Sequence, residues 1–310
     1  MSGLLEGLNT MRISQSQIGA VRRELVPGDL ALPTPAETAE VQVDGTQKTI
    51  DAHGTVEPRK AFELEKTRSV MAQPPVTSRL VAWTTPNSLG AEKFRALAVR
   101  LDDMRRHHQL NSLQVTSSVI NEGKSFVAAN LAVTLAKYSG SRTLLIEGDL
   151  HRPTLASMLG LKDLQGLSEW WSAGRIQDLS RFLVRLTGTA LWFLPAGKAC
   201  DRPSEILRSA QLAEAFAQFA SRFDWIVVDS TPMLPVIDAN LWSRLVDGTL
   251  LVVREGVAPL KALKNGLQSL DNPKLVGVVI NEASEFDQVD YDGQYYGSGK
   301  YGDKRSGKIA

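Results

Sequence analysis

The residues best suited to chemistry lie in one short segment, residues 118–125, which reads Ser-Val-Ile-Asn-Glu-Gly-Lys-Ser. A short strand-like segment at 113–116 precedes it, and a helix-forming run rich in alanine and leucine follows it. In such a loop Gly123 lets the backbone approach a phosphate, Lys124 adds positive charge, and the Ser125 hydroxyl can bind Mg²⁺. A helix that begins here also directs its free N–H groups toward an anion. We therefore predict a phosphate-binding loop between a strand and a helix.

The loop matches the full phosphate-loop pattern at its end but not at its start, where Ser118 stands in place of glycine. The predicted ligands are ATP and Mg²⁺, because this loop type holds the phosphates of a nucleotide together with its metal ion. The predicted nucleotide-binding residues of the loop are Ser118, Val119, Ile120, Asn121, Glu122, Gly123, Lys124, Ser125 and Phe126.

Two other apolar segments end in acidic residues. Residues 225–228 lead into Asp229, and residues 144–146 lead into Glu147 and Asp149. Mg²⁺ in nucleotide sites takes one or two carboxylates together with phosphate oxygens. We therefore predict that Asp229, at the end of its strand, holds Mg²⁺ directly or through water.

Strand-like and helix-like segments alternate from residue 90 onward. One apolar stripe at helical spacing runs through Phe94, Leu97, Leu101 and Met104. Near-continuous apolar strands separated by helices indicate an α/β fold, with a doubly wound, mostly parallel sheet and helices on both faces. The expected strands are 113–116, 143–146, 191–194, 225–228, 249–253 and 275–280, and the expected helices include 90–108, 124–138, 211–223 and 260–270.

Composition narrows the function classes. The 35 Lys and Arg residues and 34 Asp and Glu residues leave a formal net charge of +1, so no whole-chain field attracts nucleic acid. Cys200 is the only cysteine, which excludes an intramolecular disulfide and suits a reducing compartment. No apolar run approaches the roughly 20 residues of a membrane helix. We expect a cytoplasmic protein that a partner recruits to the inner face of the membrane.

We expect three regions along the chain. Residues 1–80 are rich in proline and lack a steady apolar period, which predicts a poorly ordered extension with one short helix near 14–25. Residues 81–286 should form the nucleotide-binding domain. Residues 287–310 are rich in glycine, tyrosine, aspartate and lysine, which is typical of a flexible tail.

These motifs together resemble a known family. The phosphate loop, the segment Leu-Leu-Ile-Glu-Gly-Asp-Leu-His-Arg-Pro at 144–153 and Val-Val-Asp-Ser-Thr-Pro at 227–232 look like the three Walker motifs of bacterial tyrosine kinases. Pro-Ser-Glu-Ile-Leu at 203–207 also resembles a segment of these capsule and exopolysaccharide kinases. The resemblance begins near residue 88. It implies an ATP-dependent protein-tyrosine autokinase that regulates polysaccharide biosynthesis.

The resemblance also implies roles for individual residues. Asp149 would orient or deprotonate the incoming tyrosine, Glu147 would support the water shell of the metal, and Asn281 would contact adenine or cap the structure. The implied catalytic residues are Lys124, Asp149, Asp229 and Glu147, and the implied metal-site residues are Ser125, Asp229 and Glu147. The implied phosphoacceptors, phosphorylated by a neighbouring subunit, are Tyr291, Tyr295, Tyr296 and Tyr301.

The partners that the resemblance implies are a membrane polysaccharide co-polymerase of the Wzz-like kind as activator, a tyrosine phosphatase, and further copies of the chain. Oligomers of the family form through a Glu-x-x-Arg-x-x-Arg helix. Glu92 and Arg95 match that pattern, but Ala98 stands at the place of the second arginine. A homo-oligomer is therefore expected, while ring formation stays open.

Departures from the family pattern leave alternatives. The second motif normally reads Asp-x-Asp-x-Arg, whereas this chain has Glu147 at the first acid and His151 at the arginine. Reduced activity, or a nucleotide-binding regulatory scaffold without useful kinase activity, is the main alternative. A partitioning-type ATPase is another, although Val119 stands where those proteins carry a signature lysine.

Overall fold

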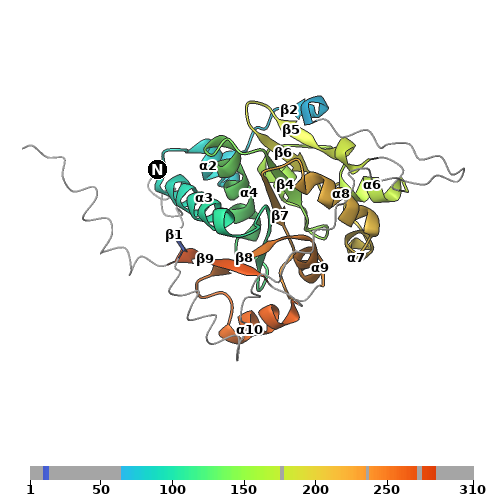
Figure 1. Ribbon diagram of the computed structural model, residues 1–310. Coiled ribbons are helices and arrows are strands. Elements are labelled where there is room, and N and C mark those ends of the chain that lie inside the picture. The colour runs from blue at the N-terminus through green and yellow to red at the C-terminus, as the bar shows by residue number, and fades with distance from the viewer. Residues whose placement is uncertain (1–9, 14–63, 175–177, 235–236, 271–273, 284–310) are drawn as a thin grey trace, which may run out of the picture.

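The fold is a single mixed sheet with helices on both faces, in a computed structural model that describes residues 10–13, 64–174, 178–234, 237–270 and 274–283. Within these ranges nine strands follow the order β1-β9-β8-β3-β7-β4-β6-β5-β2 (Figure 1). The strands are β1 (Thr10–Ile13), β2 (Arg68–Val70), β3 (Ser112–Ser117), β4 (Thr143–Glu147), β5 (Val184–Leu186), β6 (Leu191–Leu194), β7 (Trp225–Asp229), β8 (Gly248–Arg254) and β9 (Leu275–Ala283).

The central strands are parallel. β9, β8, β3, β7, β4 and β6 all run in one direction, whereas β1 is antiparallel to β9 and β5 is antiparallel to β6. Every residue of β3, β4 and β7 is buried, as expected in a sheet covered on both faces, and β4 and β7 are largely apolar in sequence. The predicted α/β class with a mostly parallel sheet is therefore confirmed.

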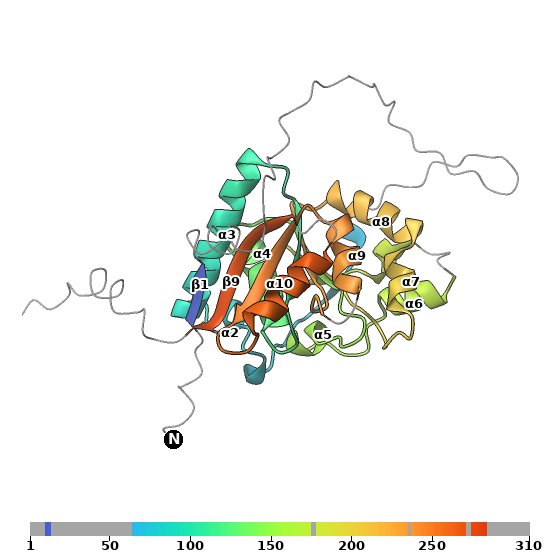
Figure 2. The ribbon, with the colours of Figure 1, turned by 90° about the horizontal axis from the view of Figure 1, so that it is seen from below.

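The helices divide between the two faces, as the turned view also shows (Figure 2). Their bounds are α2 (Val81–Thr84), α3 (Leu89–His107), α4 (Lys124–Lys137), α5 (Leu155–Met158), α6 (Leu167–Ser172), α7 (Pro203–Leu207), α8 (Ala210–Ala220), α9 (Asp238–Leu245) and α10 (Leu260–Ser269). Three short 3-10 helices accompany them: η1 (Leu64–Lys66), η2 (Val76–Ser78) and η3 (Leu179–Phe182).

One core lies between the sheet and helices α2, α3 and α4, and it includes the predicted stripe of α3. Phe94, Leu97 and Leu101 are each at most 2% exposed there. Helix α4 is buried along residues 127–136, because the sheet covers it on one side and α3 on the other. A second core contains residues of α6, α7, α8 and α9 packed against the opposite face of β4 and β7. Because the central strands are parallel, their carboxyl ends all lie at the same edge of the sheet, and the two cores pack on either face of these strands.

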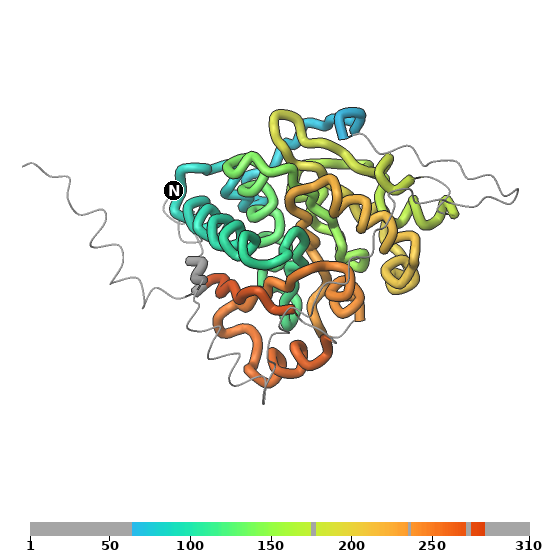
Figure 3. The backbone as a smooth tube through the Cα atoms, viewed as in Figure 1, coloured from blue at the N-terminus to red at the C-terminus, as the bar shows by residue number. Residues whose placement is uncertain are grey.

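Residues 64–80, which were expected in the poorly ordered extension, contribute to the sheet and to the first core. β2 pairs in parallel with β5, so this early segment lies beside a strand more than a hundred residues later (Figure 3). Leu80 has no exposed surface, and Ala72 packs in the first core. β1, also inside the expected extension, pairs with the edge of β9. Short strands at sheet edges bury too little to show a period, so sequence pattern misses them.

Several other predictions fall on residues outside the described ranges. They include the helix near 14–25 and the tail with Tyr291, Tyr295, Tyr296 and Tyr301. The three-region division as a whole therefore stays a prediction. Within the ranges that the structure describes, no helix is both long enough and apolar enough to cross a membrane.

Candidate functional site

The phosphate loop connects β3 to α4. Gly123 occupies the N-cap position of α4 with φ +93°, a left-handed conformation that glycine adopts without strain. Asn281, from the end of β9, donates its Nδ2 hydrogen to the Glu122 carbonyl oxygen at 3.0 Å. That amide nitrogen lies in the space that a Cβ atom on residue 123 would occupy. Glycine is therefore required here by backbone conformation and by packing alike.

Glu122 stabilises the loop from inside. Its side chain has no exposed surface, and Oε2 accepts hydrogen bonds from Ser118 Oγ at 2.8 Å and from the Val119 N–H at 2.9 Å. Oε1 accepts from the Arg254 N–H at 3.3 Å, which links the loop to the end of β8. The Glu122 carboxylate thus faces its own loop and not the cavity. It also gives a reason for serine at position 118, where the full loop pattern has glycine.

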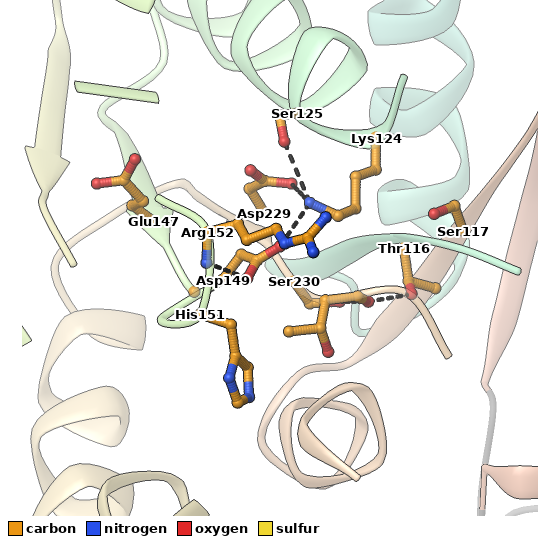
Figure 4. Close-up of polar contacts among 12 residues, drawn as sticks. Thr116, Ser117, Lys124, Ser125, Glu147, Asp149, His151, Arg152, Asp229 and Ser230 are labelled. Carbon is orange, nitrogen blue, oxygen red and sulfur yellow. Dashed lines mark hydrogen bonds and ion pairs between the residues drawn. The ribbon is translucent and has the colours of Figure 1, made fainter. Parts of the chain in front are cut away.

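Lys124 lies among oxygen atoms at the start of α4. Its Nζ is 2.9 Å from Asp149 Oδ2, 3.2 Å from Ser125 Oγ and 3.7 Å from Asp229 Oδ1 (Figure 4). β4 and β7 are neighbouring parallel strands, so Asp149 and Asp229 follow or end strands at the same sheet edge. The structure therefore brings together Lys124, Ser125, Asp149 and Asp229.

Burial and neighbouring charges shift the pKa values of these groups in opposite directions. Burial alone lowers the pKa of the Lys124 ammonium, but the carboxylates of Asp229 and Asp149 outweigh it and raise that pKa above its usual value. Asp229 is 1% exposed, and burial raises its pKa to about 6 although Lys124 and Ser125 act to lower it. Without a further positive charge nearby, ionisation of the Asp229 carboxyl at this buried position is energetically unfavourable.

Glu147 lies away from the loop. Its Oε1 accepts the N–H groups of Leu155 at 2.5 Å and Ala156 at 3.2 Å, at the start of α5, and its Oε2 accepts the Ala196 N–H at 3.1 Å. Figure 4 shows the carboxylate pointing away from Lys124 and Asp229. Burial raises the pKa of Glu147, although these hydrogen bonds oppose the change. The structure does not bring this residue to the predicted metal site; its carboxylate instead connects β4 to α5 and to the chain after β6.

The chain after β4 adds a pair that the sequence did not predict. His151 Nε2 lies 2.9 Å from Asp238 Oδ2 at the first residue of α9. Asp238 is 2% exposed, and its burial raises its pKa although His151 acts to lower it. The Arg152 N–H donates to Asp149 Oδ1 at 3.0 Å, which fixes the Asp149 carboxylate. No local pattern marks Asp238, because only the fold places it opposite His151.

A cavity of about 520 Å³ opens beside the loop. Six predicted site residues are not among the residues that line it: Ser118, Val119, Glu122, Glu147, Asp229 and Asn281. The lining residues are Ile120, Asn121, Gly123, Lys124, Ser125, Phe126, Asp149, His151, Arg152, Thr154, Met158, Thr231 and Pro232. This mixture of a lysine, helix N–H groups and apolar side chains fits a polyphosphate chain with a flat, partly apolar group attached.

Buried polar atoms at the same place fit a nucleotide and a divalent cation. Within the described part of the chain, both carboxylate oxygens of Asp229 and the Thr231 hydroxyl lack a hydrogen-bond partner. Such buried atoms ordinarily have partners, and an unpartnered one costs about 1–3 kcal/mol. A cation beside Asp229 and Ser125, with phosphate oxygens nearby, would supply partners for these atoms.

A strand, a tight loop and a helix that begins with lysine, beside a buried aspartate on the next strand, define a P-loop nucleotide-binding protein of the α/β class. No protein-family model matches the chain. It is 31% identical over 222 residues to the Staphylococcus aureus protein named "Putative tyrosine-protein kinase CapB", and the match covers 71% of this chain and 94% of that one.

Two further comparisons agree. The chain is 34% identical over 235 residues to the succinoglycan biosynthesis transport protein ExoP of Rhizobium meliloti, covering 72% of this chain and 28% of ExoP. The solved BceF tyrosine kinase domain has a TM-score of 0.59 and 29% identity, and the match covers 65% of this chain and 81% of that domain. The chain belongs to the bacterial tyrosine-kinase family, as the sequence resemblance predicted. It spans only about a quarter of ExoP.

Proposed function

We propose that this chain is an ATP-dependent protein-tyrosine autokinase that regulates capsule or exopolysaccharide biosynthesis. The observation that carries the proposal is the position of Lys124 at the start of α4, within 4 Å of both Asp149 and Asp229. Relatives named as tyrosine-protein kinases support the same conclusion. The ligands proposed are ATP and Mg²⁺.

The reaction is transfer of the terminal phosphoryl group to a tyrosine hydroxyl, and positioning and charge neutralisation supply most of the catalysis. Lys124 exchanges its contact with Asp149 for phosphate oxygens when nucleotide binds. That exchange releases the Asp149 carboxylate to orient the acceptor hydroxyl or to accept its proton. Ser125 and Asp229 would hold Mg²⁺, which would neutralise charge on the phosphate oxygens. Glu147 takes a supporting role through α5, because its oxygens are already bonded to backbone N–H groups.

The acceptors proposed are Tyr291, Tyr295, Tyr296 and Tyr301 on a neighbouring copy. A membrane polysaccharide co-polymerase would activate the protein at the inner face of the membrane, and a tyrosine phosphatase would reverse the modification. The name of the relative ExoP, a succinoglycan biosynthesis transport protein, supports the link to polysaccharide export.

The direct test is phosphate mapping by mass spectrometry after incubation with MgATP. We expect phosphate on the tail tyrosines of the wild type and none on Lys124→Ala. To test transfer between copies, a chain ending at residue 286 is mixed with full-length Lys124→Ala. Phosphate on the tyrosines of the inactive copy is then the expected result. Circular dichroism of Lys124→Ala controls for loss of fold.

Nucleotide binding without tyrosine phosphate would contradict the kinase proposal for the isolated chain. A regulatory scaffold would then be the better candidate. The side-chain direction of Glu147 favours that second candidate, since an acid expected near the metal is bonded elsewhere. Restored phosphorylation on addition of the membrane partner would return the kinase to first place.

A further inference from the structure

Thr231 follows Asp229 by two residues and lines the cavity beside the phosphate loop. The residue is 1% exposed, and within the described part of the chain its hydroxyl has no hydrogen-bond partner. Thr231 lies in the segment 227–232 that resembles the third Walker motif, but the sequence assigned it no role. A buried hydroxyl usually has a partner, so an unpartnered one at a binding cavity needs an explanation.

The backbone around Thr231 is held rigidly. The Thr231 carbonyl oxygen accepts hydrogen bonds from Thr116 Oγ1 at 2.8 Å and from Ser230 Oγ at 3.2 Å. On either side, the Ser230 N–H donates to the Val115 carbonyl and the Met233 N–H donates to the Ser117 carbonyl. β3 therefore fixes this loop at both ends. With the backbone fixed, the Thr231 hydroxyl moves by rotation about its Cα–Cβ bond, and the cavity that Thr231 lines is where a ligand could give it a partner.

The position of Thr231 indicates which part of a ligand it meets. In P-loop sites the backbone of the loop holds the inner phosphates, and the lysine extends to the outer ones. Lys124 extends to Asp149 and Asp229, so the outer phosphate would lie at that end of the cavity. Thr231 belongs to the segment that follows Asp229 and shares the cavity wall with Asp149 and His151.

We propose that Thr231 is a positioning residue whose hydroxyl donates to an oxygen of the terminal phosphoryl group, so that the site distinguishes nucleoside triphosphates from diphosphates. This inference rests on the proposed function, since it requires that a nucleotide occupies the loop. A hydroxyl is suited to the contact because it can turn toward an anionic oxygen without adding charge to the site.

The test compares wild type with Thr231→Val, which replaces the hydroxyl by a methyl group of similar size, and with Thr231→Ser, which keeps the hydroxyl. Calorimetry measures the Kd for the Mg²⁺ complexes of ADP and of the slowly hydrolysed analogue adenosine 5′-(β,γ-imido)triphosphate. We expect Thr231→Val to weaken triphosphate binding roughly 10- to 100-fold, as for loss of a hydrogen bond to a charged group. Binding of ADP should stay within about twofold, and Thr231→Ser should match the wild type.

The same substitution should have the opposite effect on the protein without nucleotide. Thr231→Val removes a buried group that lacks a partner, so its unfolding temperature should be equal to or above that of the wild type. Thr67→Val is the matched control. Its hydroxyl also lacks a partner among the described residues, but it lies beside the edge strand β2, away from the phosphate loop. It should leave the ratio of the two Kd values unchanged.

Equal loss of ADP and triphosphate affinity in Thr231→Val, or no loss of either, would overturn the inference while leaving nucleotide binding established. Loss of the triphosphate preference in Thr231→Ser would also overturn it, since packing of the methyl group would then be the cause. If Thr231→Val does not fold, Thr231→Ala supplies the variant without a hydroxyl. A wild type that binds neither nucleotide would instead overturn the proposed function, and this inference with it.

Discussion

Individual carboxyl groups at this site differ in what surrounds them, even though all are buried. Each oxygen of Glu147 and Glu122 accepts hydrogen bonds from the chain itself. Asp229 has none within the described residues and depends on the charge of Lys124 at 3.7 Å. Carboxylates that accept hydrogen bonds from the protein stabilise the fold. A buried carboxylate without such donors, close to the phosphate loop, is suited to bind a ligand.

Titration of Asp229 gives a prediction at this scale. Its pKa is about 6 in the folded protein, against about 4 in an unfolded chain. The raised pKa favours the folded state fully below about pH 4, and this contribution is lost as the pH rises through about 6. Asp229→Asn cannot ionise, and Lys124 stays charged across the range. The unfolding free energy of Asp229→Asn relative to wild type should therefore increase between pH 4 and 6, by up to about 3 kcal/mol.

Urea denaturation of both proteins without nucleotide, at several pH values across that range, measures this difference. A difference that stays constant from pH 4 to 6 would contradict the assignment of the raised pKa to Asp229. Asp224→Asn is a useful control, because the hydrogen bond to Arg142 lowers the pKa of Asp224. The stabilisation from that ionised carboxylate is lost only below about pH 4, so the difference between Asp224→Asn and wild type should stay nearly constant from about pH 4 to 6.

Among the elements, the phosphate loop is held by the ends of two other strands. Asn281 of β9 donates to the Glu122 carbonyl, and the N–H of Arg254 in β8 donates to the Glu122 carboxylate. A loop shaped in advance requires less ordering when phosphate binds. Asn281 was expected to contact adenine or to cap the structure. In the structure its amide nitrogen supports the loop, while a role in contacting adenine stays a prediction.

Substitution of Gly123 tests this arrangement. Gly123→Ala places a methyl group where the Asn281 amide lies and also strains a backbone with φ +93°. We expect nucleotide affinity to fall at least tenfold and stability to fall by about 2–4 kcal/mol, from strain of about 1–3 kcal/mol plus the displaced hydrogen bond. Calorimetry and thermal unfolding measure the two effects.

Gly140→Ala is the matched control, because Gly140 has φ +65° but no atom within 4 Å of the added methyl group. It should lose stability through backbone strain alone and keep its nucleotide affinity. Adding Asn281→Ala to Gly123→Ala should recover part of the stability. If Gly123→Ala binds nucleotide as well as Gly140→Ala does, the contact between Asn281 and the loop is unimportant.

At the scale of the whole molecule, segments from the first part of the chain complete the sheet and the first core. β2 forms one edge beside β5, and Leu80 is fully buried under α4 and its neighbours. A domain that started at residue 81 would expose the core that Leu80 and Ala72 cover.

Truncation measures the contribution of this segment. A chain beginning at residue 81 should be less stable than one beginning at residue 64 by about 2–5 kcal/mol, from lost burial of Leu80 and of β2. For a domain of this size that lowers the unfolding temperature by roughly 2–4 °C per kcal/mol. Both truncated chains lack β1, so the comparison isolates residues 64–80. Equal unfolding temperatures would place the true domain boundary at residue 81.

The sequence by itself predicted two things about this protein, the phosphate-binding site and the fold class. Local chemistry marked the phosphate loop and the acids at strand ends, because a glycine, a lysine and a serine in fixed order are suited to bind phosphate when they lie between a strand and a helix. Apolar runs marked the central strands and the stripe of α3, because both faces of the sheet are covered and burial imposes a period. The α/β class and the family followed from these.

Only the tertiary structure decided the directions of individual side chains and the pairing of distant segments. Glu147 and Asp149 are two residues apart, yet the first binds the backbone of α5 and the second binds Lys124. Asp238 opposite His151, and the unpartnered hydroxyl of Thr231, likewise depend on neighbours remote in sequence. Side-chain direction follows from the competition between all nearby partners for each polar atom, and those partners meet only after the strands have paired and the helices have packed.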